Sequence, residues 1–184
     1  YHYLFGDDFL VAPIYQDDLN NTVTLPKGKW RYFFNDNEVF EGVTSFEKSF
    51  PLEEFPVFIR EGAIVPLNIQ RSYTGLGSEE NAGKDTWLIY PGMDNAFTLY
   101  HPDKSGTTTL TMKNLSDHLE IITKDTRKPS VYTIRLENNP VKVLFNEIEL
   151  SDSVDYRFDK QKHRLTVHID HVMDGVMKIF QAEF

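Results

Sequence analysis

The stretch Pro51–Pro66, with the sequence PLEEFPVFIREGAIVP, contains two short apolar runs separated by a turn signal. The first run, Val57–Ile59, is β-branched or aromatic throughout, which favours a pleated strand. The second run, Ala63–Val65, follows a Glu-Gly pair that is typical of a turn. Prolines bracket the two runs, and proline favours strand starts, edges or bulges because it lacks an N–H for the ladder. The pattern predicts a compact hairpin with two apolar faces that other parts of the protein must cover.

Short strand patterns and polar turns precede this stretch, and no helical periodicity interrupts them. Strands are predicted over Phe9–Ile14, Thr22–Leu25, Trp30–Phe34, Glu38–Phe40 and Ser45–Phe50. A Gly-Asp-Asp turn lies before the first strand, and Asn35–Asn37 is expected to form a tight turn because Asn and Asp tolerate positive φ. Six or seven such strands predict a small antiparallel sandwich or barrel-like domain.

The sequence after residue 66 contains a polar segment and then a second set of strands. Residues 68–86 are rich in Gly and Ser and are expected to contain a linker. Thr86–Tyr90 and Ala96–Tyr100 then fit strands, and hairpin turns are expected at Asn146-Glu147, Asp159–Lys162 and Asp174-Gly175. Alternating apolar residues mark further strands: Leu110 and Met112; Leu119 and Ile121; Tyr132, Ile134 and Leu136; Leu165, Val167 and Ile169. The fold class predicted for the whole chain is all-β, with two small antiparallel β-sandwich domains.

Composition excludes several classes of function. The 184 residues carry a formal charge of −9, with 19 basic residues scattered among 28 acidic ones, so a nucleic-acid partner is not expected. The absence of cysteine excludes disulfides and thiol catalysis but is compatible with either a reducing or an oxidising compartment. No apolar run reaches the length that a membrane span requires. Since Tyr1 lies within an apolar stretch, we expect the chain to be a piece of a longer protein.

Four segments of the chain together resemble glycoside hydrolase family 31, the family of α-glucosidases and α-xylosidases. Phe5–Ile14 (FGDDFLVAPI) is similar to the segment that leaves the last strand of the family's catalytic barrel, and Thr24–Trp30 (TLPKGKW) to its Leu-Pro-x-Gly-x-Trp signature. Pro51–Pro66 resembles a third motif, and Tyr90–Tyr100 (YPGMDNAFTLY) the start of the distal C-terminal domain. The resemblance covers most of residues 1–106 and is weak beyond them.

The chain also departs from the family pattern at two places. Asn37 replaces a glycine that is usual in the family. His101–Gly106 lacks the acidic Asp-Asp-Gly that often follows the tyrosine in the family, so no role of that turn is carried over to this chain.

The resemblance implies a domain plan and a partner. Residues 1–15 would be a remnant of the last barrel strand and the lead into the next domain. Residues 16–74 would then form the proximal C-terminal sandwich, 75–86 a linker, and 87–184 the distal sandwich. The missing catalytic barrel is the expected partner, through the side chains of Tyr1, Tyr3, Leu4, Phe5 and Phe9.

The resemblance also implies the chemistry of a parent enzyme. Family members cleave α-glycosidic bonds with retention, using two carboxylates about 5 Å apart. Both are aspartates on barrel strands that precede the segments found here. We therefore predict no catalytic residue, no cofactor and no metal site in this chain, and expect it to be inactive alone. The parent's substrate would be an α-linked oligosaccharide.

Several local groups have residue types that occur both in functional sites and in structural roles. Asp7 and Asp8 are neighbours, and a turn or strand-end role is favoured because adjacent strand residues point to opposite faces. The acidic pairs Asp17-Asp18 and Glu53-Glu54 are expected in solvated loops. Surface positions are favoured over a metal site for His163, His168 and His171. Trp30, Tyr32, Phe33 and Phe34 could form a sugar-stacking platform, although at least half of them should lie in the core.

Three functions therefore remain open from the sequence. The first is a non-catalytic accessory region of a retaining α-glycosidase, which caps and stabilises the catalytic barrel. The second is a carbohydrate-binding β-sandwich module that holds glycans through exposed aromatic side chains such as Trp30 or Tyr32. The third is a structural spacer or dimerisation domain.

Overall fold

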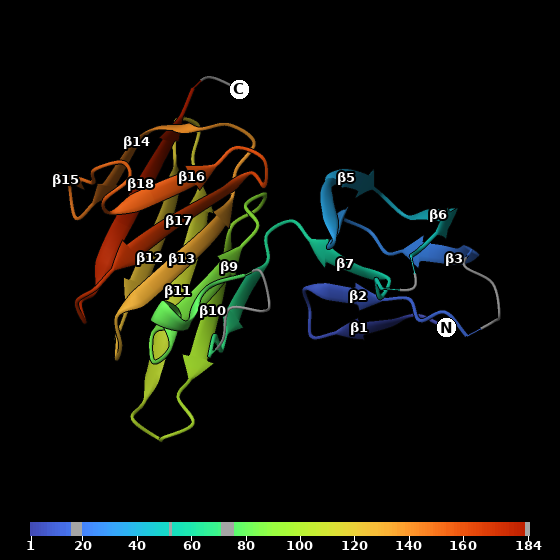
Figure 1. The fold of residues 1–184 in the computed structure, drawn as a ribbon, viewed down its shortest axis with the longest axis horizontal. Helices are drawn as coiled ribbons and strands as arrows, with labels where there is room; N and C mark the ends of the chain where they lie inside the picture. The colour runs from blue at the N-terminus through green and yellow to red at the C-terminus, as the bar shows by residue number, and fades with distance from the viewer. Residues whose placement is uncertain (16–19, 52, 71–75, 183–184) are drawn as a thin grey trace. The chain divides into compact units, whose positions relative to one another are not determined.

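The computed structural model describes residues 1–15, 20–51, 53–70 and 76–182. The chain divides into two compact units, unit 1 (Tyr1–Ala63) and unit 2 (Ile64–Phe184) (Figure 1). In the described ranges the regular structure consists of strands and one 3-10 turn, η2 (Glu79–Asn81). These strands form several largely antiparallel sheets in sandwich-like units, so the predicted all-β class is confirmed.

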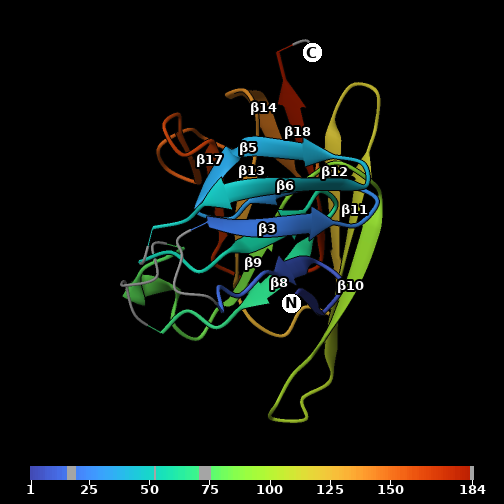
Figure 2. The same ribbon diagram turned by 90° about the vertical axis from the view of Figure 1, so that its right-hand side faces the viewer.

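Unit 1 consists of a five-stranded antiparallel sheet and a two-stranded ribbon. The sheet has the order β1-β2-β7-β4-β5, and the ribbon is formed by β3 and β6, which lie side by side in Figure 2. The strands span β1 (Tyr3–Phe5), β2 (Phe9–Val11), β3 (Asn20–Leu25), β4 (Lys29–Tyr32), β5 (Asn35–Glu41), β6 (Thr44–Ser49) and β7 (Val57–Arg60). Side chains from both layers form one small core: Leu10, Ala12, Val23, Leu25, Trp30, Tyr32, Phe50 and Phe58.

Phe58 lies at the centre of this core, on the middle strand β7. Its ring is fully buried, and its centroid lies 5.5 Å from that of Tyr32 and 5.6 Å from that of Phe40. The rings of Phe46 and Phe50 follow at 6.0 and 6.4 Å. Aromatic rings meeting edge-on or tilted in this way stabilise a core beyond the area that they bury. The aromatic residues of this part of the sequence therefore hold the ribbon on the sheet.

Unit 2 is a larger sandwich of two sheets. The first sheet has the order β10-β11-β12-β18-β14-β15, and the second has the order β16-β17-β13-β9-β8, with β9 and β13 parallel (Figure 1). The strands span β8 (Ile64–Leu67), β9 (Asp85–Ile89), β10 (Asn95–Tyr100), β11 (Thr107–Asn114), β12 (Leu119–Lys124), β13 (Ser130–Arg135), β14 (Pro140–Phe145), β15 (Ile148–Glu149), β16 (Tyr156–Asp159), β17 (Arg164–Ile169) and β18 (Gly175–Gln181).

The core of unit 2 follows the predicted alternation. Leu110 and Met112 of β11 face Tyr132 and Ile134 of β13 within one buried cluster, with Trp87 fully enclosed among them. The residues between them on β11 are half-buried. A strand whose alternate side chains meet a second sheet about 10 Å away produces this period of two.

The predicted hairpin at Pro51–Pro66 is wrong, because its two strands join different sheets. β7 pairs with β2 and β4 in unit 1, whereas β8 pairs with β9 in unit 2. Between them, Glu61 Oε1 accepts hydrogen bonds from Arg31 Nε and Nη2 at 3.1 and 2.8 Å, and Gly62 has a φ of 91°. The turn expected at Glu61-Gly62 is present, but it does not close a hairpin. Its Glu61 carboxylate forms an ion pair with Arg31 of β4. The two units meet in sequence at Ala63–Ile64, earlier than the linker expected at 75–86.

Two further turn predictions are wrong and two are confirmed. The turn expected at Asn35–Asn37 lies instead at residues 33–34, because Tyr32 pairs directly with Asn35. Asp174-Gly175 is not a hairpin turn: β17 pairs with β13 and β16, and β18 pairs with β12 and β14. The turns at 146–147 and 159–162 do join paired strands, with both residues of the first at positive φ.

Candidate functional site

The β1–β2 hairpin of unit 1 presents an apolar surface to solvent, which we call the apolar arm and define as Tyr1, Tyr3, Leu4 and Phe5. Their side chains are 85%, 50%, 54% and 70% exposed, respectively. Consecutive strand residues point to opposite faces, so exposure of all of β1 means that neither face is covered. Single exposed apolar residues are ordinary, but contiguous ones mark an interaction site. Phe9, across from Phe5, is half-buried, with its ring 5.8 Å from that of Phe33.

The arm is attached to a rigid part of unit 1. Its partner strand β2 pairs with the central strand β7, and Leu10 of β2 is 3% exposed. The Arg60 amide donates a hydrogen bond to the Asp8 carbonyl at 2.9 Å, and the Arg60 guanidinium lies 3.4 Å from the Asp8 carboxylate. These contacts fix the turn that carries the arm, so the exposed side chains occupy a defined position.

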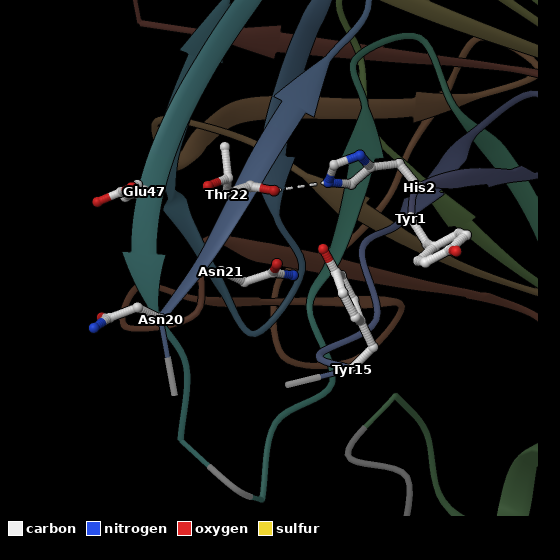
Figure 3. A pocket seen from close by; sticks show the side chains of 7 residues that line it. All are labelled: Tyr1, His2, Tyr15, Asn20, Asn21, Thr22 and Glu47. Atoms are coloured by element: carbon white, nitrogen blue, oxygen red, sulfur yellow. Dashed lines mark hydrogen bonds between the residues drawn. The ribbon is translucent and has the colours of Figure 1, made fainter. Parts of the chain in front are cut away.

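A pocket of about 370 Å³ lies beside the arm, within unit 1 (Figure 3). The imidazole of His2 points across it to the Thr22 carbonyl, with Nε2 at 2.9 Å. The rings of Tyr1 and Tyr15 meet edge to face at 5.2 Å between centroids. The remaining lining comes from the ribbon, through residues 20 and 21 of β3 and Glu47 of β6. This pocket could not be predicted from sequence, because it joins the N-terminal residues and Tyr15 to two strands that meet only when β3 pairs with β6.

The carboxylate pairs considered from the sequence do not converge on a site. Asp7 is exposed and Asp8 half-buried in the β1–β2 turn. Asp17-Asp18 lies outside the described residues. Glu53 is exposed as expected, but the prediction is wrong for Glu54, which is half-buried and accepts a hydrogen bond from the Tyr32 hydroxyl. Burial, together with the Glu54 carboxylate, raises the pKa of Tyr32.

Two of the four aromatic residues considered for a sugar-stacking platform lie in the core, in agreement with the expectation that at least half of them would. Trp30 and Tyr32 are each 2% exposed and belong to the core of unit 1. The Trp30 indole also donates its N–H to the Pro26 carbonyl at 3.1 Å. Phe33 is half-buried and Phe34 is 48% exposed, both in the turn after β4. A sugar ring has no access to the two side chains proposed as its platform.

The histidines occupy separate environments. His171 is exposed, whereas His163 and His168 are half-buried, and the described residues contain no group of three or more His, Cys, Asp or Glu that could hold a metal. The sequence did not single out His101, which is 5% exposed. Its Nε2 lies 2.8 Å from Thr108 Oγ1 and 3.8 Å from the carboxylate of Asp85.

Asp85 completes this buried polar cluster at one end of the unit 2 core. The residue is 6% exposed, and its Oδ2 has no hydrogen-bond partner. Burial raises the pKa of the Asp85 carboxyl, His101 and Lys128 oppose the shift, and Asp103 adds to it. This cluster is a point where the stability of unit 2 responds to protonation.

Comparison with known proteins identifies the family of unit 1. Residues 1–65 match the family model described as "Glycosyl hydrolase family 31 C-terminal domain". An alpha-xylosidase of Saccharolobus solfataricus is 30% identical over 107 residues, which are 55% of this chain and 14% of the relative. An alpha-glucosidase of the same organism is 37% identical over 65 residues, 35% of this chain and 9% of the relative. Residues 1–65 are therefore a C-terminal domain of glycoside hydrolase family 31, and the resemblance found in the sequence is confirmed.

The solved structures extend the likeness of fold to nearly the whole chain. The cycloalternan-forming enzyme of Listeria monocytogenes matches with a TM-score of 0.84 over 97% of this chain and 18% of its own, at 20% identity. Both units therefore have the fold of the corresponding part of that enzyme. The chain spans less than a fifth of the length of each of these proteins. Over its described residues, it contains no helix of the length and apolar character that a membrane crossing needs.

Proposed function

We propose that this chain is the non-catalytic C-terminal accessory region of a retaining α-glycosidase, in which it caps and stabilises a catalytic barrel. The observation that carries the proposal is the apolar arm, a strand exposed on both faces yet fixed at its base. The match of residues 1–65 to a C-terminal domain of glycoside hydrolase family 31 supports a glycosidase parent. The relatives named alpha-xylosidase and alpha-glucosidase support an α-linked oligosaccharide as the parent's substrate.

The arm meets the requirements of a docking surface. Leu4 and Phe5 alternate across β1, so a partner that covers both would enclose the hairpin on its two faces. Burying a leucine or phenylalanine side chain that is otherwise exposed contributes about 1.5–3 kcal/mol. Tyr1 and Tyr3 can bury their rings while keeping their hydroxyls at the polar rim, and tyrosine is enriched at interfaces for that reason. In this proposal Phe9 supports the arm from β2 and meets the partner at its edge.

The test is association with the catalytic barrel of the same polypeptide, expressed separately. We expect the two parts to elute together from a sizing column, and the double variant Leu4→Ser/Phe5→Ser to elute apart from the barrel. Tyr100→Ser is the matched control, because it removes a 76%-exposed aromatic side chain from unit 2. Retained association of the arm variant would contradict the docking role. Self-association of the chain through the arm would favour a dimerisation domain instead.

A second measurement tests the absence of catalysis. The 184-residue chain should not release glucose or xylose from α-linked substrates, because none of its motifs resembles those that carry the family's nucleophile and acid. Activity should require the barrel. Release of either sugar by the purified chain at a rate proportional to its concentration would contradict the proposal.

A further inference from the structure

We infer that the pocket between the N-terminal residues and the β3–β6 ribbon binds a neutral sugar unit of an oligosaccharide. The inference concerns different residues from the buried pair Trp30 and Tyr32. It goes beyond docking. Tyr1 belongs to the arm and also lines the pocket, but Leu4 and Phe5, the arm residues changed in the docking test, are not among its described lining residues, so the two proposals are tested separately. Its basis is the combination of size, ring placement and polar chemistry.

Size and shape suit a small hydrophilic ligand. The volume of about 370 Å³ falls at the lower end of the range for small-molecule sites. The walls come from three separate parts of unit 1: the first two residues, Tyr15, and the paired strands β3 and β6 (Figure 3). Two hydrogen bonds fix these walls. His2 bonds the Thr22 carbonyl, and Asn21 Nδ2 donates to the Ala12 carbonyl at 2.8 Å.

The polar groups favour a neutral polyhydroxyl ligand over an ion. Lysine and arginine are absent from the part of the lining that the structure describes, so no fixed cation there favours phosphate or a carboxylate. Glu47 is the one acidic residue among the described residues of the lining, and the described chain has no metal-binding cluster, so these residues offer a cation too few ligands. A carboxylate accepts hydrogen bonds and hydroxyls can both donate and accept. Glu47 and Thr22 therefore match the hydroxyls of a sugar.

Tyr15 provides the apolar complement. Its side chain is 59% exposed, and Tyr1 contacts it edge to face, which restrains the ring while leaving part of its surface open. A pyranose ring has an apolar C–H surface as well as its hydroxyls, and an aromatic ring can cover the first while a carboxylate binds the second. Tyr15 and Glu47 are thus the two residues whose removal should cost most binding.

The experiment is a titration of the 184-residue chain followed by NMR, with maltotriose and isomaltotriose as probes. We expect saturable binding with a dissociation constant of about 1 mM, which suits a small open site, and shifts confined to residues around the pocket. Tyr15→Ala and Glu47→Ala should each weaken binding by about tenfold, which corresponds to the loss of one good contact. Tyr100→Ala is the matched tyrosine control and should bind like the unchanged chain.

Two further measurements make the outcome of the titration decisive. Tyr15→Phe retains the ring and should retain most of the binding, which separates loss of the ring surface from misfolding. Sodium phosphate and sodium acetate should produce no saturable shifts at the pocket. The inference is overturned if neither sugar binds saturably, if Tyr15→Ala binds as well as Tyr100→Ala, or if phosphate binds in the pocket more tightly than the sugars. Since the arm variant Leu4→Ser/Phe5→Ser should still bind sugar, failure here is distinct from failure of the docking proposal.

Discussion

The two units build β-sandwiches of different completeness. In the described residues, the core cluster of unit 2 contains seventeen buried side chains from two broad sheets, whereas that of unit 1 contains eight from a sheet and a narrow ribbon. Unit 2 has strands of up to eight residues, and unit 1 ends its sheet with the three-residue strands β1 and β2. The difference teaches that unit 2 completes its own core, whereas unit 1 leaves the apolar side chains of β1 exposed at the edge of its sheet.

Each unit contains one of the two tryptophans, which allows this comparison to be tested. Trp30 is buried in unit 1 and Trp87 in unit 2. The variant Trp87→Phe therefore reports unfolding of unit 1 by fluorescence, and Trp30→Phe reports unit 2. Urea titrations of the two should give separate transitions, with unit 1 unfolding at the lower urea concentration because its buried apolar surface is smaller.

The largest effect is expected from Phe58→Ala in unit 1. Removing a fully buried phenylalanine costs about 3–5 kcal/mol, and four other rings surround this one. We expect the Trp30 transition to move to much lower urea or to disappear, with the Trp87 transition unchanged. Val43→Ala, at a position that is 77% exposed, should change stability by no more than about 0.5 kcal/mol. Equal loss in both units would show that the units do not unfold separately.

A smaller effect is expected in unit 2 from Gly175→Ala. A Cβ at this position would lie 2.1 Å from the ring of Phe145, so the ring must move. Overpacking of this kind costs about 1–3 kcal/mol. The Trp87 transition should shift to lower urea, and adding Phe145→Leu should recover part of the loss. If Gly175→Ala alone leaves the transition in place, the close packing of β18 against β14 is not as described.

The pH dependence of unit 2 should be smaller still and should come from Asp85. Its raised pKa means that folded unit 2 binds the proton more tightly than the unfolded chain does. The stability that the protonated Asp85 carboxyl contributes is fully present below the ordinary aspartate pKa of about 4. This stability is lost as pH rises through the higher pKa that Asp85 has in the folded state. Asp85→Asn should flatten the fall in unfolding free energy above pH 4, measured by the Trp87 transition. An unchanged pH profile in the variant would contradict this role.

The smallest effect on stability is expected from the apolar arm. Leu4→Ser/Phe5→Ser changes side chains that are 54% and 70% exposed, so the Trp30 transition should move by no more than about 0.5 kcal/mol. The same variant should fail to bind the barrel. A loss of stability comparable to that of Phe58→Ala would mean that the arm belongs to the core of unit 1 rather than to an interface.

Much of the fold could be predicted from local pattern. The alternation at Leu110 and Met112 indicates the inner face of β11 because strand side chains have a period of two. Family resemblance identified the family whose C-terminal domain residues 1–65 match, although the proximal domain was predicted over residues 16–74. Exposure of the predicted contact residues Tyr3, Leu4 and Phe5 agrees with the predicted partner surface. The hairpin turn predicted at Asn146-Glu147 is confirmed, and its first residue is an asparagine, which tolerates positive φ.

The errors arise where partners are distant in sequence. The run at Ala63–Val65 has the composition of a return strand, but its best partner is β9, more than twenty residues later. Trp30 and Tyr32 have the residue types of a sugar platform, and only tertiary packing decides that they are core. The pocket and the Asp85–His101 cluster join residues from several strands, so no local signal marks them.

The most direct test of the central claim is the unfolding of unit 1 with and without the catalytic barrel. With the barrel at 100 times its dissociation constant, binding should stabilise the folded state by about 2.7 kcal/mol. The Trp30 transition should shift to higher urea accordingly, and Leu4→Ser/Phe5→Ser should abolish the shift. A Trp30 transition that stays at the same urea concentration with and without the barrel would contradict the account.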